Sequence, residues 1–146
     1  MRGYACVGLM NPKSGENVGG VMRACGVYGA AAVFVYGTRF DKFRNHPTDT
    51  MKAWRHIPVI EGPSPLDVRP YDCQLVAVEI VDEAVPLPSF SHPERALYLL
   101  GPEDGSIQTT LLVKAQHVVQ IPTMRCMNLA ATANVVLYDR LAKGSP

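Results

Sequence analysis

The first 36 residues constrain the fold most strongly, because two apolar runs flank a stretch with helical spacing. Tyr4–Met10 is a short apolar run that Asn11-Pro12 ends, which is typical of a buried strand. Residues 31–36 form a second run that is rich in β-forming residues. A strand, a helix and a second strand in this order form a βαβ unit, which predicts a parallel sheet with a right-handed crossover.

The stretch between these strands carries the signals of a helix. Asn17 is expected to act as its N-cap, and Gly29 is a natural end. Apolar residues recur between them at helical spacing, at Val18, Val21, Met22 and Cys25. One side of this helix is therefore expected to be buried.

The rest of the chain continues this alternation. Four further strands are predicted, at residues 57–60, 74–80, 96–100 and 117–121. Helices are predicted at residues 47–54, 108–114 and, long and apolar, 127–141, while residues 82–95 form a connection broken by prolines. The pattern predicts one α/β domain over residues 1–146, with a mostly parallel, doubly wound sheet and helices on both faces.

Composition excludes several classes of protein. Apolar residues make up 47% and charged residues 18% of the chain, which is the balance of a globular protein. The formal charge of +1 gives no overall signal for nucleic acid, so any such binding must depend on a local patch. The four cysteines lack CxxC spacing and the four histidines lack metal-ligand spacing, so we expect no metal site. No run has membrane-spanning length and the N-terminus does not read as a signal peptide, so we expect a cytoplasmic protein.

Three loops follow predicted strands and carry unusual residues. They are residues 11–17 (NPKSGEN), 101–106 (GPEDGS) and 122–128 (PTMRCMN). Ligands collect at the carboxyl ends of strands in open α/β sheets, and glycines let the backbone approach a ligand closely. These loops are therefore the expected site.

Three residues in or near these loops have both a structural and a functional interpretation. Arg23 borders the buried helix face, so it is either a solvated helix arginine or an active-site cation. Glu103 either caps the next helix or belongs to the site. Asn128 precedes the long apolar helix and is expected to cap it.

Residues 37–56 are basic, with aromatic residues interleaved. The segment is either a solvated loop or an RNA contact surface, with cations on phosphates and rings against bases. The cations are Arg39, Lys42, Arg44, Lys52 and Arg55.

Taken together, the motifs resemble the SpoU-type branch of the SPOUT superfamily, RNA ribose 2′-O-methyltransferases that use S-adenosylmethionine. The likeness covers nearly the whole chain. The first motif is N-x-G-x-x-x-R, here Asn17, Gly19 and Arg23. The second is an apolar strand running into G-P-E, and the third is Ile121-Pro122 followed by M-N-L and an apolar helix. The chain looks most like the minimal members that modify the tRNA wobble ribose.

The resemblance implies a C-terminal deep trefoil knot, a homodimer and an RNA substrate, and the likeness to the minimal members makes tRNA the expected RNA. It makes Arg23 the catalytic candidate, acting by electrostatic stabilisation, with Asn17 and Glu103 holding the geometry. The implied contacts to S-adenosylmethionine come from Val78, Gly101, Ile121, Cys126, Met127 and Leu129. The last helix is implied to lie in the dimer interface.

The chain also departs from the family pattern. Gly20 stands where most relatives have a second asparagine, and Ala130 stands where a serine is common. Cys126 replaces a serine that is frequent in relatives. Gly105 lies one position earlier than the glycine of many relatives, and Ser106 follows it. These changes leave two alternatives open: a dimeric RNA-binding module with a vestigial cofactor pocket, and an α/β enzyme that uses another nucleotide cofactor. The second lacks a GxGxxG motif and a P-loop.

Overall fold

The computed structural model describes residues 3–37 and 55–144. Seven strands are present in this part of the chain: β1 (Tyr4–Met10), β2 (Val33–Tyr36), β3 (Val59–Gly62), β4 (Gln74–Val78), β5 (Val85–Pro86), β6 (Arg95–Leu100) and β7 (His117–Gln120). The helices are α1 (Gly15–Tyr28), α2 (Thr109–Lys114) and α3 (Leu129–Ala142), with a short 3₁₀ turn, η2 (Leu87–Ser89). None of these helices is long and apolar enough to cross a membrane.

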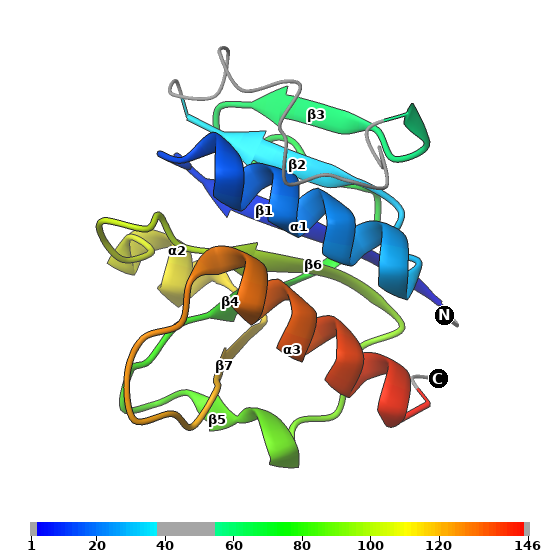
Figure 1. Ribbon diagram of the computed structural model, residues 1–146. Helices are drawn as coiled ribbons and strands as arrows, with labels where there is room; N and C mark the ends of the chain where they lie inside the picture. The colour runs from blue at the N-terminus through cyan, green and yellow to red at the C-terminus, as the bar shows by residue number, and fades with distance from the viewer. Residues whose placement is uncertain (1–2, 38–54, 145–146) are drawn as a thin grey trace.

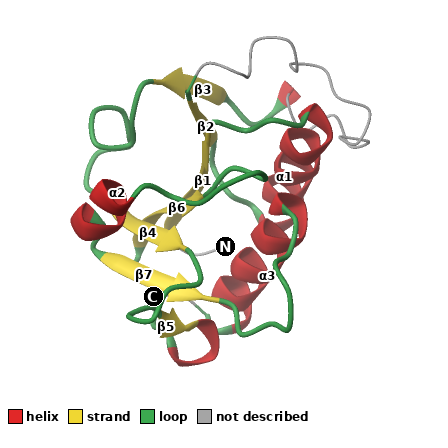
Figure 2. Ribbon diagram, turned by 90° about the vertical axis from the view of Figure 1, so that its left-hand side faces the viewer, coloured by secondary structure: helices red, strands yellow, loops and turns green. Residues whose placement is uncertain are grey.

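The strands form one sheet in the order β3-β2-β1-β6-β4-β7-β5, and every pairing is parallel (Figure 1). Helices cover both faces: α1 and α3 lie together on one face, and α2 lies on the other (Figure 2). The predicted α/β class, parallel sheet and two-sided helix cover are therefore confirmed.

The apolar core has two parts, one on each face of the sheet, because successive side chains of the central strands point to opposite faces. On β1, Val7 and Leu9 face α1 and α3, while Cys6 belongs to the core on the α2 side. Val136 and Leu137 of α3 complete the first core, and Leu111 of α2 belongs to the second. The central strands β1, β4 and β6 are buried on both faces, as parallel strands usually are, whereas the edge strands β3 and β5 are more exposed.

Several element boundaries differ from the sequence prediction. Ser14, not Asn17, is the N-cap of α1: the Ser14 hydroxyl accepts a hydrogen bond from Asn17 N at 3.4 Å, so the helix begins before Asn17. Gly29 ends this helix with a left-handed φ of 75°, as predicted. The connection over residues 82–95 contains β5 and η2, which the sequence prediction missed. The helix predicted at residues 47–54 lies outside the described residues.

A buried polar network holds the end of α3. Arg140 is fully buried and donates hydrogen bonds to the carbonyls of Pro93 and Glu94, at 2.7 and 2.8 Å, and to the Tyr98 hydroxyl at 2.9 Å. The His92 ring lies between Tyr98 and Asp139, with 2.7 Å contacts on both sides. His92 therefore has a structural role in this network.

Candidate functional site

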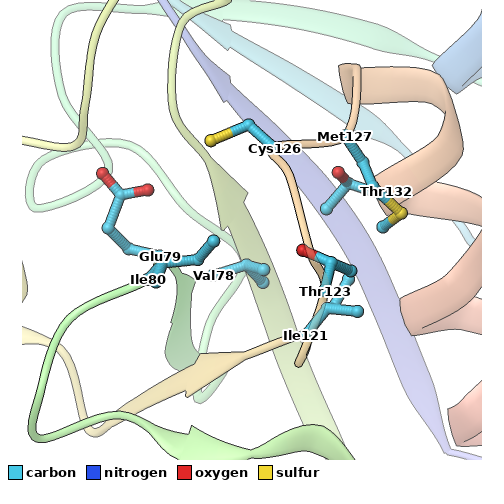
Figure 3. A pocket seen from close by; sticks show the side chains of 8 residues that line it. All are labelled: Val78, Glu79, Ile80, Ile121, Thr123, Cys126, Met127 and Thr132. Carbon is cyan, nitrogen blue, oxygen red and sulfur yellow. The ribbon is translucent and has the colours of Figure 1, made fainter.

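Two adjoining cavities lie at the carboxyl edge of the sheet, beyond the ends of β4, β6 and β7. Their volumes are about 360 and 100 Å³. They share a wall made of Val78, Glu79, Cys126, Met127 and Thr132, whose side chains surround the smaller cavity in Figure 3. The larger cavity also reaches the loop after β6 and the start of α1. All three loops expected from the sequence therefore meet around one space. The first loop contributes only its last residue, Asn17.

The turn between β7 and α3 forms one wall. The Thr123 hydroxyl donates a hydrogen bond to the Arg125 carbonyl at 2.7 Å, which tightens the turn. Asn128 caps α3 as predicted, because its Oδ1 accepts from Ala131 N at 2.8 Å. The turn therefore has a defined path past the cavity, with Cys126 exposed and Leu129 buried.

Glu103 fastens the loop after β6 to the start of α1. Its carboxylate accepts hydrogen bonds from Lys13 N, Ser14 N and Asn17 Nδ2, at 3.0, 2.7 and 3.3 Å. Burial opposes ionisation, yet these hydrogen bonds outweigh it and hold the pKa of Glu103 below its ordinary value. Glu103 therefore anchors α1, which precedes it. Of its two interpretations, capping of the next helix does not apply, because α2 has Gln108 at its N-cap and no side-chain cap hydrogen bond.

Gly101 lies where two loop segments approach each other. A Cβ at this position would come within 3.2 Å of Ile107 N and 3.3 Å of Ile107 Cγ1. A side chain at this position would therefore press on the backbone of the returning loop, which a glycine avoids.

Glu79 joins the same loop from the other side. It follows β4, and its Oε1 accepts a hydrogen bond from Ile107 N at 3.1 Å. The sequence prediction missed this residue, although an acidic residue at the end of the apolar run QLVAVEI was a visible signal.

The structure brings most of the predicted site residues together. All six expected cofactor contacts line one cavity or both: Val78, Gly101, Ile121, Cys126, Met127 and Leu129. Asn17 and Glu103 also line the larger cavity. Arg23 does not line either cavity; it is exposed on α1, six residues beyond Asn17.

The predicted RNA-binding residues are largely outside the structure's description. Arg39, Lys42, Arg44 and Lys52 lie outside the described residues, and Arg55 is exposed. Among residues 3–37 and 55–144, no group of His, Cys, Asp and Glu side chains could hold a metal ion.

Comparison with known proteins gives the family. The model of the SpoU rRNA Methylase family matches residues 4–138. The chain belongs to this family. Among curated proteins, this SpoU family member is 26% identical over 132 residues to the mouse tRNA (guanosine(18)-2′-O)-methyltransferase TARBP1, covering 84% of this chain and 8% of that protein.

Solved structures show the same fold at low sequence identity. The AdoMet-bound rRNA methyltransferase from Sinorhizobium meliloti has a TM-score of 0.84 and 22% identity, covering 97% of this SpoU family member and 57% of that chain. The A. aeolicus TrmH/SpoU tRNA modifying enzyme has a TM-score of 0.82 and 18% identity, covering 98% and 78%. A structure concerning 2-OH methylation of C/U34 on tRNA has a TM-score of 0.79 and 21% identity, covering 98% and 92%. The chain thus spans less than a tenth of the mouse relative and just over half of the Sinorhizobium chain.

Proposed function

We propose that this SpoU family member is an RNA methyltransferase that transfers a methyl group from S-adenosylmethionine to a ribose 2′-hydroxyl, in tRNA. The observation that carries the proposal is the convergence of the loop after β6 and the turn before α3 on one cavity, with Glu103 anchoring that loop to α1. Names of the relatives add support, since they include a tRNA 2′-O-methyltransferase and an AdoMet-bound methyltransferase.

The cavity residues fit a nucleoside-containing cofactor. Val78, Ile121 and Leu129 offer apolar walls, and the side-chain-free Gly101 leaves its backbone close to the space. A cavity of about 360 Å³, extended by the adjoining one of about 100 Å³, is within the range of roughly 300–1,000 Å³ that small ligands occupy. When bound, S-adenosylmethionine supplies an electrophilic methyl group on a sulfonium.

The chain's own residues would position the acceptor and stabilise charge. Asn17 and Glu103 hold the start of α1 against the cavity loop. The 2′-hydroxyl is a weak acid, so the forming alkoxide needs a nearby positive charge, and Arg23 is the candidate. A guanidinium does not give up its proton in proteins, so Arg23 would act by its charge and not as a base.

The proposal includes a homodimer. Four large apolar residues of α1 and α3, the helices that share one face of the sheet, are between 38% and 53% exposed: Val27, Val135, Tyr138 and Leu141. A hollow of about 390 Å³ lies among Tyr28, Val135 and Tyr138. An apolar face of this kind marks a protein contact, and a second copy would cover it. The trefoil knot and the cytoplasmic location remain predictions.

Mass spectrometry of ribose methylation tests the activity directly. Purified protein, S-adenosylmethionine and unmodified tRNA should yield a ribose-methylated nucleoside, and Arg23→Ala should lose roughly 10²–10³ in rate while still binding the cofactor. Arg23→Lys keeps the charge and is the matched control. Calorimetry that detects no cofactor binding to the wild type would instead favour an RNA-binding module, and near-normal activity of Arg23→Ala would remove Arg23 from the mechanism.

A further inference from the structure

The charged side chains that line the two cavities, among the described residues, are Glu79 and Glu103. The other lining side chains are apolar, hydroxyl, thiol, thioether or amide groups. No arginine or lysine of the described chain lines either space to offset the two carboxylates. The site is therefore electrostatically suited to a ligand with positive charge.

The two carboxylates have different surroundings. Glu103 accepts hydrogen bonds from two backbone N–H groups and the Asn17 amide at the start of α1. The positive ends of these donor dipoles offset much of the field of its carboxylate. Glu79 accepts from a single neutral group, Ile107 N, and lines both cavities. Its charge is thus the one that acts most directly on the shared space.

We infer that Glu79 makes the cavity selective for the sulfonium form of the cofactor over its neutral thioether product. This inference rests on the proposed function. Methyl transfer converts the sulfonium of S-adenosylmethionine into the uncharged sulfur of S-adenosylhomocysteine. Attraction to the Glu79 carboxylate is present before the transfer and absent after it, so the product leaves more readily than the substrate cofactor.

The size of the effect follows from the partial exposure of Glu79. A fully buried charge would act strongly, but Glu79 is half-buried and water reduces its field. One unit charge in such a place changes the affinity for a cation by about tenfold. The thioether sulfur of the product carries no charge, so this attraction is lost, while the ammonium and carboxylate groups are common to both ligands.

Glu79→Gln separates charge from hydrogen bonding. The glutamine amide oxygen can still accept from Ile107 N, so the loop should keep its position while the charge is lost. Glu83→Gln is the matched control, since Glu83 is exposed, follows the end of β4 at Val78 by five residues and lines neither cavity.

Calorimetry on the full chain with S-adenosylmethionine and S-adenosylhomocysteine tests the inference. Wild type and Glu83→Gln should bind the sulfonium about tenfold more tightly than the thioether, and Glu79→Gln should lose this preference through weaker sulfonium binding. Hydrogen exchange at the Ile107 amide should stay slow in Glu79→Gln, which excludes a merely displaced loop.

Three results would overturn it. Equal preference in the wild type and Glu79→Gln would remove the charge effect, and an equal loss for both ligands with fast Ile107 exchange would give Glu79 a purely structural role. In either case the proposed function survives, because the cofactor still binds the wild type. If neither ligand binds the wild type, the proposed function fails, and the inference fails with it.

Discussion

At the scale of single residues, His92 shows how one buried side chain depends on the direction of its hydrogen bonds. The Arg140 guanidinium has donors and no acceptor, so the Tyr98 oxygen accepts its hydrogen bond. We therefore assign the Tyr98 hydroxyl as the donor to His92 Nδ1, which accepts. The other ring nitrogen, Nε2, then carries a proton and donates to Asp139, which also pairs with Lys143 at 2.8 Å. A neutral imidazole satisfies all of these contacts.

This arrangement predicts a pH dependence of stability. Burial lowers the pKa of His92, and the charges of Lys143 and Arg140 act in the same direction, while the hydrogen bond and charge of Asp139 oppose it. Above a pH of about 6.5 both folded and unfolded histidine are neutral; below it, the unfolded chain takes up a proton that the folded state resists. The free energy of unfolding should therefore fall as the pH decreases from about 6.5 toward the lowered pKa.

Urea unfolding at pH 7.5 and pH 5.5 measures this effect. The loss of stability between the two values should shrink in His92→Gln, whatever the absolute stability of that variant. Glu103, whose pKa is lowered, contributes in a separate window below about 4.3 and does not interfere. An unchanged pH dependence in His92→Gln would contradict the assignment of a neutral, buried imidazole.

At the scale of elements, α1 and α3 approach each other closely at Gly20. A Cβ on Gly20 would lie 2.7 Å from the Ala130 Cβ, a distance that real Cβ atoms do not adopt. Gly20 and Ala130 are both positions at which the chain departs from the family pattern, and the structure places them face to face. The two departures are therefore one matched contact between the helices.

A double-mutant cycle tests this contact. Gly20→Ala should destabilise the protein by about 1 kcal/mol, because overpacking costs roughly 1–3 kcal/mol and exceeds the gain in helix propensity of about 1 kcal/mol. In an Ala130→Gly background the clash is gone, so Gly20→Ala should become stabilising. Gly26→Ala, exposed on the same helix, is the control and should have the same sign in both backgrounds. A destabilising Gly20→Ala in both backgrounds would rule out the direct contact.

The sequence predicted elements best where burial on both faces made an apolar run unambiguous. Tyr4–Met10 has the predicted bounds, and β6 and β7 differ by one residue. It failed where the deciding partner is distant: β5 is a strand of two residues that exists through its pairing with β7. The N-cap of α1 was misplaced because both Ser14 and Asn17 are good capping residues, and only the backbone path chooses between them.

The candidate site was predictable in its parts but not in its connections. The family resemblance named six cofactor contacts together with Asn17 and Glu103, and all of these line the cavities, since the motifs fall near strand ends. It implied that Asn17 and Glu103 hold the geometry of the site, but not that Glu103 accepts hydrogen bonds from the backbone before α1 or that Glu79 accepts one from Ile107 N, because these contacts join residues 86–90 and 28 positions apart. Nor did it show that Arg23 lies outside the cavity of its own chain.

At the scale of the whole molecule, the exposed face of α3 predicts self-association. Val135→Glu places a charge on this face, and in a symmetric dimer the charge enters twice, so the dissociation constant should rise by about 100-fold. Val113→Glu is the matched control, because Val113 is 78% exposed on α2, on the opposite side of the sheet. Sedimentation equilibrium measures both. A monomeric wild type, or equal weakening by the two substitutions, would contradict the proposed interface.

The position of Arg23 leads to a prediction about how two copies share the reaction. Arg23 is exposed, does not line the cavity of its own chain, and precedes the exposed Val27 by one helical turn. Val27 belongs to the apolar face proposed for the dimer, so Arg23 lies beside that face. We therefore expect Arg23 to serve the cavity of the second copy.

Mixed dimers decide this point. Arg23→Ala leaves a chain with an intact cavity, and Gly101→Val leaves a chain with Arg23 and an obstructed loop, since even a Cβ there meets Ile107 N at 3.2 Å. Each variant alone should be inactive, but a mixed dimer would combine one intact cavity with one arginine from the partner. Random mixing makes half of the dimers mixed, each with one working site, so activity should return to roughly a quarter of wild type.

Mixing Arg23→Ala with the double variant Arg23→Ala/Gly101→Val is the control and should restore nothing. If the first mixture is as inactive as the control, Arg23 acts within its own chain.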